Sequence, residues 1–165
     1  MTSGRFWFHT CALPGVLALL SASTGCTGGG GSPCSNCPPI EGRYALQLEE
    51  SAFPEDCGEV AVDLPEGPLE VSRQGSDVTA TLNGMTLRGT LYTTYDFNLL
   101  GVGAETTDGG IGGLESASLS GRYIPAVGDG GVPRLRGDWQ GTYSGTSGGG
   151  TRYCTVTRPF TAPRQ

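Results

Sequence analysis

Residues 78–87 read VTATLNGMTL, and this stretch decides the fold class of the chain. Along its first half, apolar residues alternate with threonines, which is the period of a strand with one buried face. Asn83-Gly84 then supplies the two positive φ angles of a type I′ turn, whose twist matches the strands on either side. The stretch therefore predicts a tight antiparallel β-hairpin.

The same alternation continues on both sides of this hairpin, interrupted by turn residues at intervals of about eight to twelve positions. About nine strands are expected, and their apolar faces are formed by Tyr44, Leu46 and Leu48; Val60 and Val62; Leu69 and Val71; Val78, Ala80 and Leu82; Met85, Leu87 and Leu91; Tyr95, Phe97 and Leu99; Leu119 and Tyr123; Leu135, Trp139 and Tyr143; and Val156. The 126 residues from position 40 to position 165 can form one core and are too few for two. We therefore expect a single all-β domain, an antiparallel up-and-down β-barrel or flattened barrel of about eight or nine strands.

A tripeptide of glycine, any residue and an aromatic residue recurs at Gly42-Arg43-Tyr44, Gly121-Arg122-Tyr123, Gly137-Asp138-Trp139 and Gly141-Thr142-Tyr143. The glycine and the ring fall on the same strand face, so the glycine lets the strand bend and leaves room for the ring. In this spacing and in its expected strand order the chain resembles the lipocalins and avidins, the small ligand-binding barrels. The resemblance implies the barrel architecture alone, because no residues match the ligand-contacting residues of either family.

The first 25 residues form a predicted export signal, with Arg5 as a positive start and an apolar run over residues 11–20. This run is too short for a membrane-spanning helix, which needs about 20 residues. Small residues then lead directly into Cys26, which resembles the bacterial lipobox, although Ser23 stands where that family normally has leucine. The resemblance implies cleavage before Cys26 and a lipid anchor on its thiol, and Thr27 in place of aspartate implies sorting to the outer membrane. The alternative is ordinary signal-peptidase cleavage after Ser23, which would leave Cys26 as a free thiol.

The number of cysteines separates these two alternatives. The chain has six, and Cys11 leaves with the signal. If Cys26 is acylated, an even set remains for disulfides, whereas a free Cys26 leaves an odd thiol in an oxidising compartment. The remaining set is Cys34, Cys37, Cys57 and Cys154. The count therefore favours acylation of Cys26.

Cys57 and Cys154 are expected to form a disulfide, because a closing barrel brings the second and the last predicted strands together or nearly so. Cys34 and Cys37 have the C-x-x-C spacing of redox enzymes, in which a following helix lowers the thiol pKa. Pro38-Pro39 prevents a helix from following promptly, so we expect a short structural disulfide instead. Residues 26–39 are rich in glycine and proline and are predicted to form a flexible tether, which would hold the domain about 20 Å from its anchor.

The charged residues exclude several classes of function. The chain has 16 acidic and 10 basic residues, and removal of Arg5 leaves a formal charge of 9 minus 16, or −7. Such a charge repels nucleic acid and anionic membrane surfaces alike, which leaves the acyl chains as the membrane attachment. Lysine is absent, and the one histidine, His9, lies in the signal. Zinc sites, Ser-His-Asp catalysis and Schiff-base chemistry are therefore excluded, and we expect neither an enzyme nor a cofactor.

The acidic residues themselves are densest over residues 49–70. A pair of carboxylates from this run would be needed for glycosidase-like chemistry. The run lacks the ordered ligand spacing of a calcium loop, and we interpret it as a solvated face.

Aromatic residues from several predicted strands are the candidate ligand-binding residues. They are Trp139, Tyr143, Tyr123, Tyr95 and Phe97, which would line a cavity with Arg88 or Arg122 at its mouth to pair with an anionic group. The alternative is that these rings fill the barrel as its core, because a barrel of about eight strands can be either filled or hollow. The glycine-rich connections at residues 101–113 and 128–131 would either frame a site at one end of the domain or serve only as connections.

Taken together, these patterns predict a lipid-anchored envelope protein with a non-catalytic binding role. A lipocalin-like carrier of a small apolar ligand is the first hypothesis. The second is a protein-binding envelope factor resembling the small lipoprotein inhibitors of lysozyme, or a structural lipoprotein.

Overall fold

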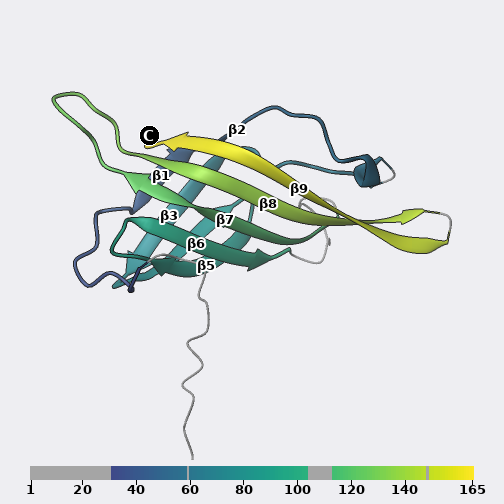
Figure 1. Cartoon of the computed structure of the whole chain (residues 1–165), viewed down its shortest axis with the longest axis horizontal. Coiled ribbons are helices and arrows are strands. Elements are labelled where there is room, and N and C mark those ends of the chain that lie inside the picture. Colours follow the sequence, from purple (N-terminus) through teal and green to yellow (C-terminus); the bar gives the residue numbers. More distant parts are fainter. Residues whose placement is uncertain (1–30, 59, 104–112, 148) are drawn as a thin grey trace, which may run out of the picture.

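The computed structural model describes residues 31–58, 60–103, 113–147 and 149–165. These residues form strands and one short 3-10 helix (Figure 1). The elements are β1 (Gly42–Ala45), β2 (Gln47–Leu48), η1 (Glu55–Cys57), β3 (Pro68–Gln74), β4 (Asp77–Leu82), β5 (Met85–Leu91), β6 (Asp96–Val102), β7 (Leu114–Ile124), β8 (Arg134–Ser147) and β9 (Gly150–Pro163).

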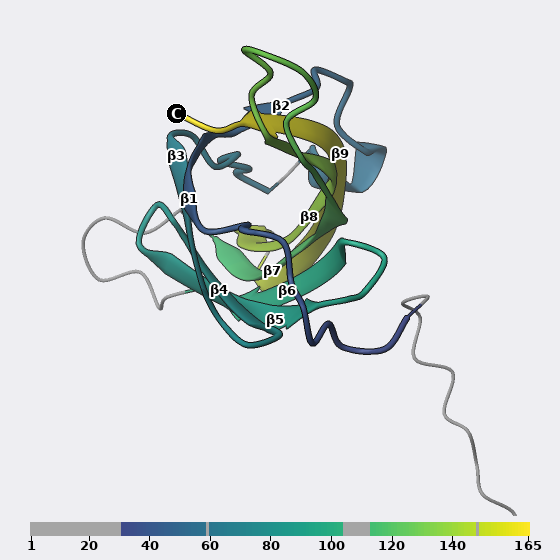
Figure 2. The same ribbon diagram turned by 90° about the vertical axis from the view of Figure 1, so that its left-hand side faces the viewer.

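The strands form one antiparallel sheet in the order β1-β3-β4-β5-β6-β7-β8-β9-β2. The two ends of this order, β1 and β2, are successive halves of one extended segment. Its first half pairs with β3, and its second half pairs with β9 through Gln47 and Leu48. The sheet therefore comes round on itself as an up-and-down barrel, which Figure 2 shows from one end. This confirms the predicted all-β barrel.

The hairpin predicted at Asn83-Gly84 joins β4 to β5. Its φ angles are 48° at Asn83 and 79° at Gly84, and Leu82 pairs with Met85 across the turn. Two successive positive φ angles are the mark of a type I′ turn. The prediction is therefore confirmed at this turn.

Inward-facing side chains fill the barrel, and the largest fully buried ones include Trp139, Tyr44, Tyr143 and Phe160. At Gly141, one of the recurring glycines, the missing side chain makes room for a ring. A Cβ atom placed on Gly141 would lie 2.8 Å from the ring of Tyr143, closer than a side chain can pack. Packing in the core thus explains why glycine precedes the aromatic residue in the tripeptide Gly141-Thr142-Tyr143.

The strand predicted around Val60 and Val62 is wrong. Residues 49–67 instead form a long connection that contains η1 and leaves the barrel surface between β2 and β3 (Figure 1). Pro54 and Pro65 interrupt this connection and lack the N–H that a ladder needs. Val60 is nevertheless buried, so the alternation correctly predicted burial but not pairing.

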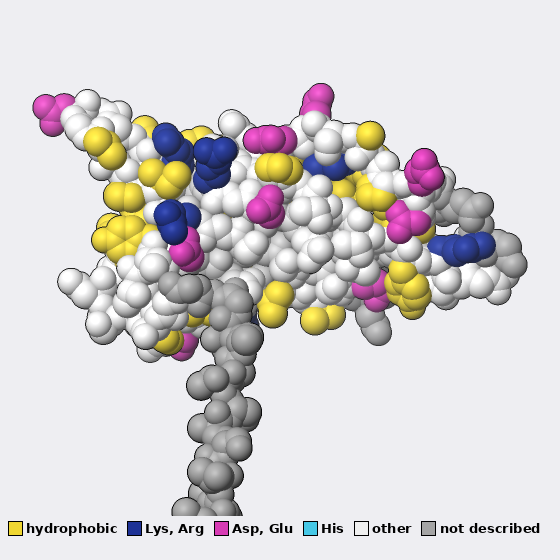
Figure 3. All heavy atoms as spheres, in the orientation of Figure 1, with side chains coloured by type: hydrophobic (Ala, Val, Ile, Leu, Met, Phe, Trp, Pro, Cys, Tyr) yellow, Lys and Arg dark blue, Asp and Glu magenta, His cyan; other side chains and the backbone are white. Residues whose placement is uncertain are grey.

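We name the two ends of the barrel by what they carry. The tether end has the β5–β6 turn, the β7–β8 loop and the C-terminus, and the far end has η1 and the tip of the β8–β9 hairpin (Figure 1). On the face shown in Figure 3, several arginine side chains gather at the tether end, whereas acidic side chains are spread along the whole length, the tether end included. The charge of the molecule is therefore unevenly distributed along the barrel.

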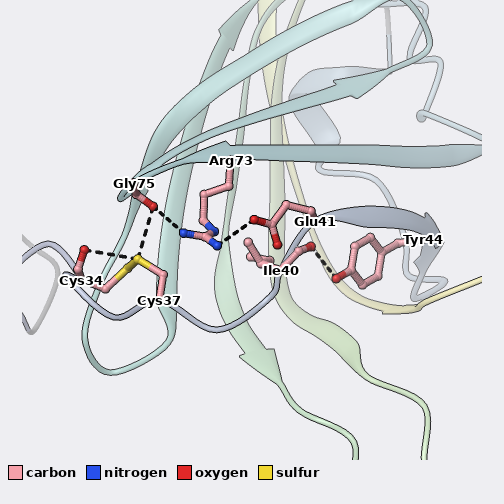
Figure 4. Close-up of polar contacts among 7 residues, drawn as sticks. All are labelled: Cys34, Cys37, Ile40, Glu41, Tyr44, Arg73 and Gly75. Carbon is pink, nitrogen blue, oxygen red and sulfur yellow. Dashed lines mark hydrogen bonds and ion pairs between the residues drawn. A yellow bond between two sulfur atoms is a disulfide. The ribbon is translucent and has the colours of Figure 1, made fainter.

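Part of the predicted tether is packed against the barrel. Cys34 is buried, and its N–H donates to the carbonyl oxygen of Leu91 at 3.0 Å. Cys34 and Cys37 are joined as a disulfide, and Sγ of Cys37 lies 3.3 Å from the carbonyl oxygen of Gly75 (Figure 4). The predicted local disulfide is thus present, and the segment after position 31 is part of the folded domain.

The chain just before β1 is held by two further contacts, also drawn in Figure 4. Arg73 of β3 pairs with Glu41 at 2.7 Å, and the Tyr44 hydroxyl donates to the carbonyl oxygen of Ile40 at 2.6 Å. Burial raises the pKa of Tyr44 to about 12. These contacts close the tether end of the barrel around the start of β1.

A candidate binding groove on the outer face of the barrel

Four of the predicted ligand-binding residues lie together inside the barrel. They are Trp139, Tyr143, Tyr123 and Phe97, and all four are buried. They form part of one apolar cluster that is continuous with the leucines and valines of the core. The structure therefore places them as the filling of the barrel.

Tyr143 and Trp139 are two of the polar members of this filling. The Tyr143 hydroxyl donates to the carbonyl oxygen of Asp63 at 2.9 Å. Burial raises the pKa of Tyr143 to about 12, against a smaller lowering by the neighbouring Trp139 indole. The indole Nε1 lies close to that hydroxyl without reaching hydrogen-bonding geometry, and it has no acceptor within the described part of the chain.

The other two predicted residues do not join this cluster. Tyr95 lies in the β5–β6 turn with its side chain 39% exposed. Arg88 faces outward from β5. Since the structure separates Arg88 from the aromatic rings, it cannot stand at the mouth of a cavity that they line.

Arg88 instead borders a groove on the outer face of β5, β6, β7 and β8. This outer groove has a volume of about 540 Å³ and is lined by Thr86, Arg88, Leu100, Gly101, Val102, Ser116, Ala117, Ser118, Gln140 and Thr142. The volume lies within the range of about 300–1,000 Å³ that is common for small-molecule sites.

The register of the sheet assembles the outer groove from four strands. Arg88 pairs with Leu100, Leu100 with Ser118, and Ser118 with Gln140, so these side chains form one row across the barrel surface. The serines of β7 are short, so the surface is hollowed between the longer side chains of β6 and β8. A row of this kind depends on exact strand pairing and is not visible in the sequence.

The apolar residues of the outer groove are unusually exposed for strand residues. Leu100 is 62% exposed and Val102 is 79% exposed. Arg88, beside them, makes no ion pair with any described residue. The groove thus combines an apolar wall with an unpaired cation, which suits a ligand that has an apolar body and an anionic group.

Arg158 is an inward-facing residue that the sequence analysis missed. It is only 3% exposed, yet it has no carboxylate partner among the described residues. Its guanidinium donates to the hydroxyl and the carbonyl oxygen of Ser51 and stacks 4.9 Å from the ring centre of Phe53. Arg158 therefore fastens the start of the 49–67 connection to β9.

The second disulfide holds the other part of that connection. Cys57, at the end of η1, is bonded to Cys154 of β9, and their Cα atoms lie 5.1 Å apart. The predicted pairing is present, although Cys57 lies in a 3-10 helix rather than in a strand.

Residues 104–112, which include most of the glycine-rich connection predicted to frame a site, lie outside the described residues. Within the part of the chain that is described, no three His, Cys, Asp or Glu side chains gather closely enough to hold a metal ion. The same residues include no helix long and apolar enough to cross a membrane.

Comparison with protein families, curated proteins and solved structures gave no match.

Proposed function

We propose that this chain is a lipid-anchored, non-catalytic binding protein of the bacterial cell envelope, and that it binds an amphipathic anion in the outer groove. The observation that carries the proposal is the pairing of exposed Leu100 and Val102 with the unpaired guanidinium of Arg88 in one hollow of ligand size. The filled interior supports the same location, because Trp139 and Tyr143 leave the barrel without exposed aromatic surface inside.

Two observations support the anchor at Cys26. The four cysteines that follow it form two disulfides, so Cys26 is the only unpaired cysteine of the mature chain. Gly31, five residues after Cys26, lies against the β5–β6 turn, so an anchor at Cys26 would hold the domain close to the membrane. The small residues before Cys26 and Thr27 after it favour lipidation and sorting to the outer membrane.

Binding in the outer groove is tested with anilinonaphthalene sulfonate, a fluorescent probe with an apolar body and one anionic group. We expect Leu100→Ser and Arg88→Gln each to weaken its binding about tenfold, since each removes contacts worth about 1.5 kcal/mol. Fluorescence titration measures the affinity. Tyr153→Ser is the matched control, because Tyr153 of β9 is also 62% exposed but lies outside the groove.

If both groove variants bind the probe as tightly as the unaltered protein does, the outer groove is not the site. An equal loss in Tyr153→Ser would lead to the same conclusion.

The anchor is tested by the mass of the mature protein extracted from membranes. We expect a chain that begins at Cys26 and carries acyl groups. A mature chain that begins at Thr24 without acyl groups would contradict the anchor but would leave the groove experiment unaffected.

A second candidate function is a protein-binding envelope factor, and the openness of the outer groove favours it. Val102 at 79% exposed is more accessible than a small ligand's enclosed site requires, whereas a protein partner would cover it. The groove lining holds Arg88 and no carboxylate, so the attraction for a cationic partner such as lysozyme would come from the net negative charge of the chain around it. With lysozyme as the probe, we expect an affinity that falls steeply with added salt and is weakened by Leu100→Ser. Binding that is indifferent to both changes would exclude a cationic partner at this groove.

A further inference from the structure

The β5–β6 turn holds an aromatic residue in a backbone conformation that disfavours it. Tyr95 has a φ angle of 67°, a left-handed conformation that glycine and asparagine adopt far more readily than other residues. Only its backbone takes part in the turn, through hydrogen bonds with Tyr92 and Tyr123. Its side chain is partly exposed. Such strain persists where the surroundings or a function require the residue, and the hydrogen bonds of the turn do not require a tyrosine.

The β7–β8 loop, residues 125–133, projects from the same end of the barrel (Figures 1 and 2). It carries two large apolar side chains in solvent: Val127 is 83% exposed and Val132 is 52% exposed. Asp129 lies between them near the tip of the loop. The valines can therefore contact an apolar layer from the sides of the loop, with its tip remaining polar.

Arginines gather on the strands next to this loop (Figure 3). Arg122 of β7 stands directly opposite Arg136 of β8, an arrangement that destabilises a sheet unless an anion lies nearby. Arg122 pairs with Asp96 at 2.7 Å, but Arg136 and Arg134 make no ion pair with any residue that the structure describes. Two cations thus remain available on this surface.

The position of Cys26 relates this end of the barrel to a bilayer. Gly31 lies against the β5–β6 turn, with the hydroxyl oxygen of Thr93 beside its Cα. The five residues from Cys26 to Gly31 span at most about 18 Å when fully extended. A lipid on Cys26 therefore holds the tether end within that distance of the membrane surface.

We propose that the tether end is a membrane-docking surface, in which Tyr95, Val127 and Val132 enter the headgroup region and Arg134 and Arg136 pair with the phosphates of anionic phospholipids. Tyrosine is enriched at membrane interfaces, and arginine pairs well with phosphate. The net negative charge of the chain does not prevent this contact, because the acidic run of residues 49–66 belongs to the connection that carries η1 to the far end. At the tether end, Asp96 is paired with Arg122 and Glu41 with Arg73, and Asp129 lies at the loop tip. The proposal rests on the proposed anchor only for the location of the bilayer.

The test uses the mature chain with Cys26→Ser, so that no lipid contributes to binding. We expect it to sediment with vesicles of phosphatidylcholine and phosphatidylglycerol more than with phosphatidylcholine alone, and less as salt is added. Arg136→Gln should weaken this binding about fivefold. Arg152→Gln, which changes an exposed arginine near the far end, is the matched control and should have no effect.

Tyr95→Asn separates a membrane role from a structural one. It relieves the strain of the turn, so the urea midpoint of unfolding should rise while vesicle binding falls several-fold. The proposal is overturned if the Cys26→Ser chain does not bind the anionic vesicles, if Arg152→Gln weakens binding as much as Arg136→Gln does, or if Tyr95→Asn leaves binding unchanged. Dimer formation that Val127→Ser and Val132→Ser abolish, with vesicle binding unaltered, would assign the surface to a second copy of the chain instead.

Discussion

The buried hydroxyl groups of two tyrosines make the barrel less stable at alkaline pH. Burial raises the pKa values of Tyr44 and Tyr143 from the ordinary 10.0 to about 12. Because these pKa values are higher in the folded than in the unfolded chain, the stabilisation is complete below about pH 10 and is lost as the pH rises through about 12. The barrel should therefore unfold more easily in this window.

Tyr143→Phe tests this dependence. The variant should be less stable by about 1 kcal/mol at neutral pH, since the hydrogen bond to Asp63 is lost. Between about pH 10 and 12 its free energy of unfolding should fall less steeply than that of the unaltered protein, by up to about 1.4 kcal/mol per pH unit. Urea denaturation at several pH values measures both effects. An unchanged slope would contradict the assigned burial of this hydroxyl, and exposed Tyr153→Phe controls for the loss of a tyrosine as such.

At the level of residues, the sequence predicted which positions face inward but not what each contact does. Alternation correctly placed Trp139, Tyr143 and Phe97 in the interior. It could not predict the burial of Arg158, because most of the groups that accept its hydrogen bonds come from Ser51 and Ala52, more than a hundred residues earlier. A buried guanidinium is recognisable only when its distant partners are known.

Among the elements, the 49–67 connection is the part that depends on cross-links rather than on strand pairing. Cys57 and Cys154 are 97 residues apart in the sequence, and closing so long a loop restricts the unfolded chain strongly. We expect Cys57→Ala with Cys154→Ala to lower the free energy of unfolding by about 2–5 kcal/mol. Denaturant unfolding measures this change.

Cys34→Ala with Cys37→Ala provides the comparison for that experiment, because this disulfide spans a sequence separation of only 3. Its removal should cost about 2 kcal/mol or less in the same entropy treatment. A larger loss there than for the long-range pair would show that packing of Cys34, rather than loop closure, determines the effect.

The predicted elements succeeded where a local signal defined them. Asn83-Gly84 specifies its turn by two residues alone, and the structure confirms it. The segment around Val60 was wrongly predicted to be a strand. Its apolar residues alternate as they do in a strand, but in this connection they pack against the core without pairing. Register is set by pairing between distant segments, so the row from Arg88 to Gln140 that forms the outer groove could not be foreseen.

For the whole molecule, the barrel architecture followed from strand number and turn spacing, whereas the arrangement of charge did not. The net charge does not say where the charges lie on the surface, and taken alone it predicted repulsion from anionic membranes. The structure separates a tether end with unpaired Arg134 and Arg136 from the acidic connection that reaches the far end. The surface that we propose to dock on a membrane is therefore set by the fold and not by the net charge.

The pairing of β2 with β9, which closes the barrel, also affects when the chain can fold during its synthesis. Leu48 of β2 finds its partner in Phe160 of β9, which leaves the ribosome more than a hundred residues later. Until then both edges of the growing sheet lack partners, and contacts between such distant segments form slowly. Strand β9 thus completes the barrel, so a nascent chain stays open at least until β9 has been synthesised.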